Sequence, residues 1–298
     1  MRDEGPLTTL PSDLQRELEA VLGVSALTVR PLGSSFGASL LRVTAGDGTY
    51  ALKWATGGAP AAMLAAEAHG LRALAATGAV RVPAIVAWLA PDAHAPTALL
   101  TEWLDSAGAP LDPATLGAQL AALHRHTAPA FGLEADNFIG GTPQLNAWQP
   151  TWPAFFRTQR LLPQLTRAEA AGLLVASRRR AIERVVARLD DLLAVSGAPS
   201  LIHGDLWGGN VVASPGGRPA LIDPAVSYSH REAEVAFTEL FGGFAPRFYT
   251  AYTAAWPLEP AYAARRPIYN LYHALNHLNL FGASYLALVD EQLEQIGV

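Results

Sequence analysis

One stretch decides how this 298-residue chain can fold and act: His203-Gly-Asp-Leu-Trp-Gly-Gly-Asn210. It matches the H-x-D-x-x-x-x-N pattern of a kinase catalytic loop. In such a loop the aspartate, here Asp205, can accept the proton of an attacking hydroxyl group. Asn210 can then reach a magnesium ion on the phosphates of a nucleotide. The spacing therefore predicts a phosphoryl-transfer loop that works with ATP and Mg²⁺.

A further aspartate, Asp223, follows the loop after two short β-rich segments. The turn residues Ser214-Pro-Gly-Gly217 separate these segments, which predicts a hairpin. A hairpin of this length returns the chain beside its start, so Asp223 is expected next to Asn210. Both side chains offer oxygen atoms, which magnesium prefers as ligands. Asn210 and Asp223 are therefore the predicted metal ligands.

The cationic residues point to a phosphate anchor near the N-terminus. The chain has twenty arginines and one lysine, so a position that keeps lysine is one where a guanidinium group would not serve. This residue, Lys53, lies on the third predicted strand, where a kinase carries its phosphate-binding lysine. Glu67 follows on a predicted helix and can pair with Lys53 to aim it at the phosphates.

The remaining nucleotide contacts are predicted from their position along the chain. A Gly-Ser turn lies between the first two strands, where backbone N–H groups can cover phosphates. A hinge between the two halves is expected where the β-rich pattern ends. The predicted ATP-binding residues are Gly33, Ser34, Ser35, Lys53, Glu67, Glu102 and Trp103.

These patterns predict an α+β, bilobal, protein-kinase-like fold. Residues 1–102 are expected to form a β-rich, nucleotide-binding N-lobe with one main helix, and residues 103–298 a larger helical C-lobe with the catalytic loop. A polar loop is expected at about 127–150, and one helix over 152–165. Strands are predicted at 26–32, 38–43, 49–54, 82–88 and 98–103, with a helix at about 59–76.

Composition excludes several classes of protein. Half of the residues are hydrophobic, 16% are charged and the net charge is −5, so neither nucleic acid nor an anionic membrane is an expected partner. The absence of cysteine excludes disulfides and thiolate metal sites, and it suits a cytoplasmic protein. No apolar run is long enough to span a bilayer, and no obligate protein partner is evident.

The segment after Asp223 separates small-molecule kinases from protein kinases. A protein kinase has a long activation segment between Asp-Phe-Gly and Ala-Pro-Glu motifs, and neither motif occurs here. A helix is instead predicted to begin near Arg231, which leaves no platform for a peptide. The sequence thus favours a closed pocket for a polar metabolite.

The chain resembles the fructosamine kinase / ketosamine-3-kinase family from about residue 30 onward. The resemblance implies ATP-dependent phosphorylation of the 3-hydroxyl of a ketosamine such as a fructosamine or ribulosamine adduct of an amine, in deglycation or salvage. The resemblance implies that Lys53 and Glu67 anchor the phosphates and that Asp205 is the base. It also implies that Asn210 and Asp223 bind magnesium. The residues that carry it are His203-Gly-Asp-Leu-Trp-Gly-Gly-Asn210, Leu221-Ile-Asp-Pro-Ala225, Thr238-Glu-Leu-Phe-Gly-Gly-Phe244 and Tyr269 to Gly282.

Some positions and the acceptor itself stay open at this stage. Trp207, His273 and Asn276 are predicted to contact the substrate. The chain departs from the family pattern at Ser227, where an aromatic residue is expected, and at His230 and Glu234, where aspartates are expected; the roles of His230 and Glu234 are open. An aminoglycoside-, choline- or homoserine-type phosphotransferase on the same fold is the alternative. Neither the amine, the length of the sugar nor the oligomeric state follows from the sequence.

Overall fold

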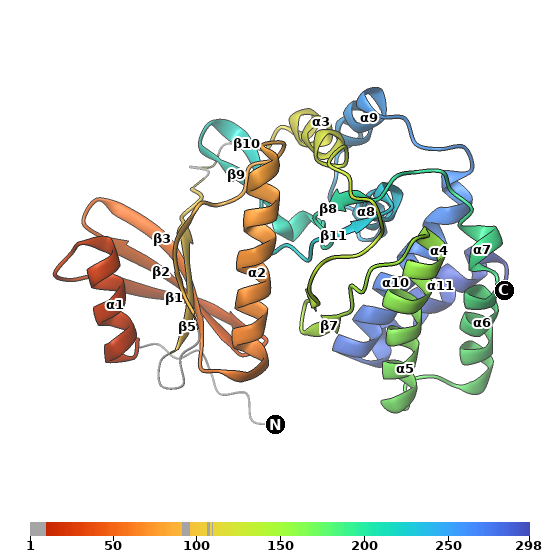
Figure 1. Ribbon diagram of the computed structural model, residues 1–298, viewed down its shortest axis with the longest axis horizontal. Helices are drawn as coiled ribbons and strands as arrows, with labels where there is room; N and C mark the ends of the chain where they lie inside the picture. The colour runs from red at the N-terminus through yellow and green to blue at the C-terminus, as the bar shows by residue number, and fades with distance from the viewer. Residues whose placement is uncertain (1–9, 91–95, 106–107, 109) are drawn as a thin grey trace.

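The computed structural model describes residues 10–90, 96–105, 108 and 110–298 (Figure 1). Its N-terminal part contains an antiparallel five-stranded sheet in the order β1-β2-β3-β5-β4. The five predicted strands and the predicted helix of this part are all present, with shifted bounds. The elements are α1 Ser12–Leu22, β1 Thr28–Ser35, β2 Ala38–Ala45, β3 Gly48–Ala55, α2 Gly58–Thr77, β4 Ile85–Leu89 and β5 Thr97–Glu102.

Two helices cover the two faces of this sheet, whereas the sequence predicts only one main helix. Leu14 and Leu18 of α1 are buried against side chains from one face of the sheet. α2 packs on the other face, which is turned toward the helical part of the chain (Figure 1). The signal for α1 lies in the spacing of Leu14 and Leu18 and in Gly23, whose positive φ ends the helix.

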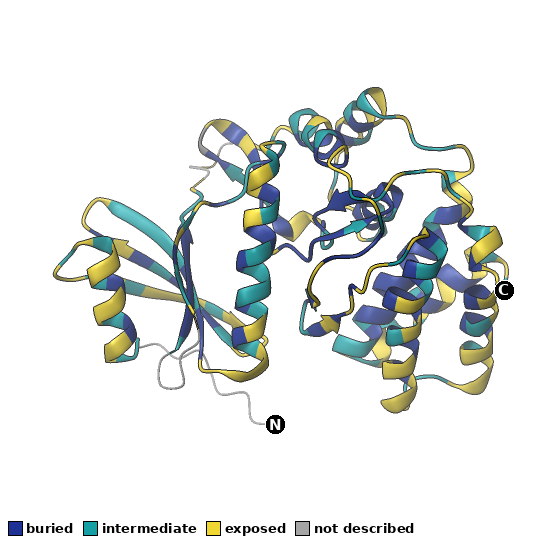
Figure 2. Cartoon of the chain, in the orientation of Figure 1, coloured by how far each residue is buried: buried dark blue, intermediate teal, exposed yellow. Residues whose placement is uncertain are grey.

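The C-terminal part is mainly helical. α10 runs through it beside α5 and α8, and buried residues fill the space between the helices (Figures 1 and 2). The helices are α3 Pro113–Leu123, α4 Trp152–Phe155, α5 Leu162–Ala170, α6 Ala176–Ala187, α7 Leu189–Leu192, α8 Arg231–Leu240, α9 Pro246–Ala255, α10 Tyr262–Phe281 and α11 Leu286–Ile296. The strands are β6 Asn137–Ile139, β7 Thr142–Gln144, β8 Ser200–Ile202, β9 Val211–Ser214, β10 Arg218–Leu221 and β11 Ser227–Ser229.

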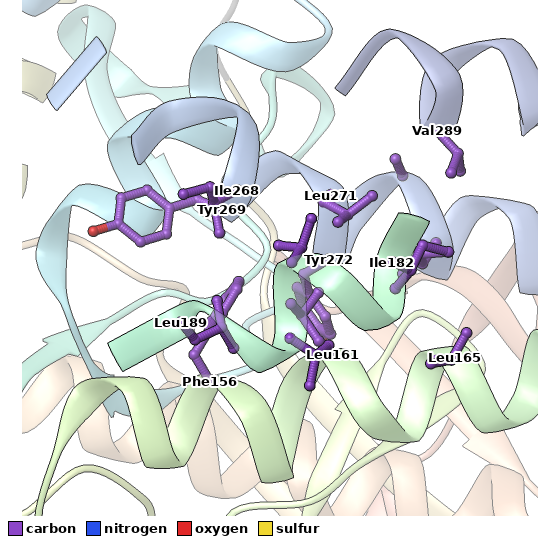
Figure 3. Close-up of a cluster of buried hydrophobic side chains, with 14 of the residues drawn as sticks. Phe156, Leu161, Leu165, Ile182, Leu189, Ile268, Tyr269, Leu271, Tyr272 and Val289 are labelled. Atoms are coloured by element: carbon purple, nitrogen blue, oxygen red, sulfur yellow. The ribbon is translucent and has the colours of Figure 1, made fainter. Parts of the chain in front are cut away.

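Aromatic and aliphatic side chains form the main core of this part. Figure 3 shows Phe156, Tyr269 and Tyr272 among aliphatic residues from several helices. The helix predicted over 152–165 is interrupted, because its middle, Phe156–Leu161, adopts a π-helix. The predicted loop at 127–150 contains β6 and β7, which pair only with each other. Strands of three residues are too short to show a clear alternation in sequence.

No helix among the described residues is long and apolar enough to cross a membrane.

His230 lies in the C-lobe core and is fully buried. Its ring is beside those of Trp152 and Tyr269, and neither ring nitrogen has a hydrogen-bond partner among the described residues. Burial, together with the positive charges of Arg231 and Arg265, lowers the pKa of His230 to about 3. The imidazole is therefore neutral in the folded chain at any ordinary pH.

The buried neutral His230 should make the fold sensitive to acid. Below an ordinary histidine pKa of about 6.5 the unfolded chain binds a proton that the folded chain does not. The free energy of unfolding should therefore fall as the pH is lowered from about 6.5, by up to about 1.4 kcal/mol for each pH unit. Urea denaturation at several pH values measures this slope. His230→Phe should make this slope shallower, and an unchanged slope in this variant would contradict the role given to His230.

Candidate active site

A cleft of about 800 Å³ lies between the sheet of the N-terminal part and the helices of the C-terminal part. Its size is within the range of pockets that hold small molecules. Residues from both parts line it, including Gly33, Ser34, Ser35, Phe36, Lys53, Glu67, Asp205, Trp207, Asn210, Asp223, Asn276, His277 and Leu280.

The alternation of β3 places Lys53 in this cleft. Its neighbours Leu52 and Trp54 are buried in the cluster beneath α1, so Lys53 points to the opposite face, toward α2. There its Nζ atom donates to Glu67 Oε1 at 2.7 Å and to Asp223 Oδ1 at 2.5 Å. Burial opposes its charge, but the two carboxylates outweigh burial and raise the pKa of Lys53 above the ordinary value. Lys53 therefore joins the two lobes as a cation.

The predicted hairpin is present and brings the two predicted metal ligands together. β9 and β10 pair so that Val211 is opposite Leu221, and Ile222 N–H donates to Asn210 O at 3.1 Å. Asp223 is the next residue along the chain. It has a positive φ of 55°, which is unfavourable for a residue with a Cβ atom and is common at functional sites.

Asp205 lies beside this pair and has the properties of a base. Asn210 Nδ2 donates to the backbone oxygen of Asp205 at 2.8 Å and to its carboxylate at 3.2 Å. Burial raises the pKa of Asp205 to about 7, and the nearby charge of Asp223 contributes in the same direction. A carboxylate with a pKa near neutrality can accept a proton in the reaction and release it afterwards.

Gly204 lets the catalytic loop lie against the segment that follows Asp223. It has a φ of +86°, and a Cβ atom at this position would lie 1.9 Å from the backbone oxygen of Ala225. Ala225 N–H in turn donates to His203 O at 2.8 Å. The loop and the segment after Asp223 are thus fixed to each other by backbone contacts that only glycine permits.

Glu234, whose role is open from sequence, holds the backbone of the catalytic loop. Its carboxylate accepts from His203 N–H at 3.1 Å and from Gly204 N–H at 2.6 Å. His124 Nε2 donates to the same carboxylate at 3.0 Å, and His124 Nδ1 is 2.8 Å from the hydroxyl group of Tyr252. Burial alone would raise the pKa of Glu234, but the hydrogen bonds from His124 and Gly204 lower it, so the carboxylate stays ionised.

Most of the predicted site residues lie in the cleft. Gly33, Ser34 and Ser35 line its N-lobe side, and Trp207 and Asn276 line its C-lobe side. The indole of Trp207 is folded over Gly209, since a Cβ atom there would be 2.2 Å from the ring. Trp207 is 45% exposed, so the rest of its ring surface is open to the cleft.

Three predicted site residues do not line the cleft. The ring of His273 is buried and stacks on Phe237 with 3.6 Å between the ring centroids. Glu102 accepts hydrogen bonds from Arg81 and from Ala84 N–H. The Trp103 ring lies beneath the guanidinium group of Arg42, and the backbone N–H of Trp103 donates to Thr49 O. The substrate contact of His273 and the nucleotide contacts of Glu102 and Trp103 stay predictions.

An aromatic surface lies on the C-lobe side of the cleft, and we call it the acceptor wall; apart from Trp207, sequence reasoning missed its residues. The ring centroids of Phe241 and His277 are 4.7 Å apart, and those of His277 and Tyr285 are 5.1 Å apart. Burial lowers the pKa of His277, so the wall is uncharged at neutral pH. The spacing of His273, His277 and Phe281 along α10 indicates one helix face but not which residues reach the cleft. The acceptor wall consists of Trp207, Phe241, His277, Phe281 and Tyr285.

The residues present fit a magnesium ion carried by a nucleotide. Asn210 uses its amide nitrogen for both bonds to Asp205, which leaves its side-chain oxygen for a cation. Asp223 adds a carboxylate. Within the described ranges, no group of three or more histidine or acidic side chains could hold a metal by itself. Magnesium in phosphotransferases is commonly held by one or two protein ligands together with phosphates and water.

Together, the two-lobed fold and this cleft define an ATP-dependent phosphotransferase of the protein-kinase-like class. A family model described as fructosamine kinase matches residues 30–297. The chain therefore belongs to the fructosamine kinase family, as the resemblance in sequence indicates.

Individual relatives agree with this assignment. A protein of Enterococcus faecium named as a probable ketoamine kinase is 41% identical over 230 residues, which are 77% of this chain and 81% of that protein. The chloroplastic protein-ribulosamine 3-kinase of Arabidopsis thaliana is 34% identical over 250 residues, which are 79% of this chain and 73% of that protein.

Solved structures confirm the fold. A structure from Thermobifida fusca, provisionally named a fructosamine-3-kinase, has a TM-score of 0.86 and 33% identity, and the match covers 96% of this chain and 99% of that one. An aminoglycoside phosphotransferase that is only 15% identical has a TM-score of 0.62, with 95% of this chain and 99% of that one covered. The protein-kinase-like fold predicted from the catalytic loop is thus confirmed.

Proposed function

We propose that the chain transfers the γ-phosphoryl group of ATP to the 3-hydroxyl of the sugar part of a ketosamine. The observation that carries this proposal is the arrangement across the cleft. Asp205, Asn210 and Asp223 face the Lys53–Glu67 pair, and the acceptor wall lines the same cleft. The names of the relatives, ketoamine kinase and protein-ribulosamine 3-kinase, support the same acceptor class.

Each residue of the site has a separate role in the phosphoryl transfer. Lys53, aimed by Glu67, binds the phosphates of ATP, and the loop from Gly33 to Ser35 covers them with backbone N–H groups. Asp205 accepts the proton of the acceptor hydroxyl as that oxygen bonds to the γ-phosphorus. Glu234 keeps Asp205 in place by holding the two residues before it.

Asn210 and Asp223 would hold the magnesium ion. Bound there, the ion would neutralise charge on the phosphates. The Nζ atom of Lys53 contacts the carboxylate of Asp223, so the proposed phosphate-binding lysine lies directly beside a proposed magnesium ligand.

The acceptor wall favours a sugar derivative over an aminoglycoside. Aromatic rings pack well against the C–H faces of sugars and against apolar amine substituents. A polycationic antibiotic would call for additional carboxylates. Among the described residues that line the cleft, Glu67, Asp205 and Asp223 are the acidic ones, and all three already have roles in the transfer.

A panel of acceptors tests the proposal. ADP formation is measured with ATP and Mg²⁺ for ribulosyl-, erythrulosyl- and fructosyl-amines, and for aminoglycosides, choline and homoserine. Turnover of at least one ketosamine, lost when EDTA removes the metal, is the expected result. Turnover of an antibiotic, choline or homoserine without turnover of any ketosamine would assign the chain to the alternative class.

A further inference from the structure

The tip of the nucleotide-binding loop reaches across the cleft and touches the C-lobe. Phe36 is at this tip, between β1 and β2, and its φ of +48° is unusual for a residue with a side chain. Its ring lies against the turn that joins β6 to β7. A Cβ atom built on Gly141 would be 2.5 Å from Phe36 Cδ1, and the three nearest atoms to it all belong to Phe36. We call this contact the Phe36 clamp.

The clamp depends on the absence of a side chain at Gly141. The backbone of Gly141 does not have a positive φ, so the reason for glycine there is the space that the ring of Phe36 occupies. The neighbouring Gly140 also lies under the ring, and a Cβ atom there would be 3.4 Å from Phe36 Cζ and 3.1 Å from Leu280 Cδ1. Phe36, Gly140 and Leu280 all line the cleft.

We propose that Phe36 is a positioning residue that closes the cleft over the reacting groups and keeps water away from the γ-phosphate. This inference rests on the proposed phosphoryl transfer. In that reaction the bond from the γ-phosphorus to ADP breaks and a bond to the acceptor oxygen forms, while the acceptor proton passes to Asp205. If water replaces the acceptor, the same bond breaks and inorganic phosphate forms.

Three features support a role in closure. Phe36 is exposed at a loop tip and has an unfavourable backbone conformation, which is expected only where another contact, here that of its ring, stabilises it. The partner belongs to the opposite lobe, so the contact joins the two sides of the cleft. Loops that cross an active site in this way commonly exclude water and complete the acceptor site.

The coupling of ATP consumption to transfer tests the clamp. Phe36→Ala should lower the amount of acceptor phosphorylated per ADP formed, and raise both acceptor-free ATP hydrolysis and KM for the acceptor by about tenfold. Phe36→Tyr should restore coupling, since its ring can lie on the same glycines. Val175→Ala, at a residue that is 58% exposed and does not line the cleft, serves as the control.

A double-mutant cycle separates the clamp from a general effect on the loop. Gly141→Ala should reproduce the effects of Phe36→Ala, because the added methyl group displaces the ring. In the Phe36→Ala background, the same glycine substitution should have a much smaller effect, because the three atoms nearest to the added methyl group are gone.

The outcomes distinguish this inference from the proposed function. Coupling is measured with whichever acceptor the wild type phosphorylates, so an error in the acceptor class does not decide the test. Full coupling in Phe36→Ala, or additive losses in the double mutant, would overturn the clamp while transfer by the wild type remained. A wild-type chain that transfers phosphate to no acceptor would reject the proposed function and the clamp with it.

Discussion

Asp205→Asn should reduce kcat for phosphoryl transfer by about 10²- to 10⁴-fold, the range typical for loss of a general base. Asparagine has nearly the same shape and can still accept the hydrogen bond from Asn210, so the loop should keep its conformation. ATP should bind as it does to the wild type, because Asp205 makes no proposed contact with the nucleotide. Single-turnover kinetics together with a nucleotide-binding titration separate the two effects.

The pH dependence gives a second readout of the same variant. A base is active when deprotonated, so activity of the wild type should rise as the pH increases through the pKa of Asp205, about 7. The residual activity of Asp205→Asn should lack this acid limb. A variant that retains both near-normal kcat and the acid limb would remove Asp205 from the role of base.

Lys53→Arg should reduce kcat/KM for ATP by about 10²-fold or more, since the lysine acts as a preorganised point charge on the phosphates. The ammonium group fits between carboxylates of two lobes, with contacts of 2.7 and 2.5 Å to Glu67 and Asp223. A planar guanidinium group is broader and cannot occupy that space without moving one carboxylate. Steady-state kinetics with varied ATP measures the loss.

An opposite exchange provides the control for this variant. Arg30 is exposed on β1 of the same sheet, and Arg30→Lys should leave the kinetics unchanged. Near-normal kinetics of Lys53→Arg would contradict the idea that the single lysine of this chain is kept for its compact charge.

The catalytic residues could be predicted because their order along the chain is tied to local structure. The hairpin of β9 and β10 follows from a Pro-Gly-Gly turn, and it places Asn210 beside Asp223 whatever the rest of the fold. Likewise, Lys53 faces α2 because successive strand residues point to opposite faces of a sheet, and its position on a strand could be predicted.

What could not be predicted depends on packing between distant segments. His273 and His277 are one helical turn apart on α10, yet only His277 reaches the cleft, because Phe237 from α8 covers His273. The carboxylate of Glu234 that binds the catalytic loop also accepts a hydrogen bond from His124, more than a hundred residues earlier. Such contacts follow from the arrangement of helices, which periodicity alone does not fix.

The structure shows which contacts are made by residues that depart from the family pattern. Ser227 is buried, is hydrogen-bonded to Arg160 and Ser229, and is not among the residues that line the cleft. The longer side chain of Glu234 reaches the backbone of His203 and Gly204 directly. The changes thus lie behind the catalytic loop, and the acceptor wall is the surface that should determine which ketosamine binds.

The position of the phosphate in the product tests the central claim most directly. After incubation of the wild type with ATP, Mg²⁺ and a ribulosyl-amine labelled with ¹³C in the sugar, NMR coupling between phosphorus and carbon identifies the phosphorylated hydroxyl. Our account predicts one phosphomonoester, on the 3-hydroxyl, which Asp205→Asn should form far more slowly. A phosphate on another hydroxyl, or inorganic phosphate as the sole product, would contradict it.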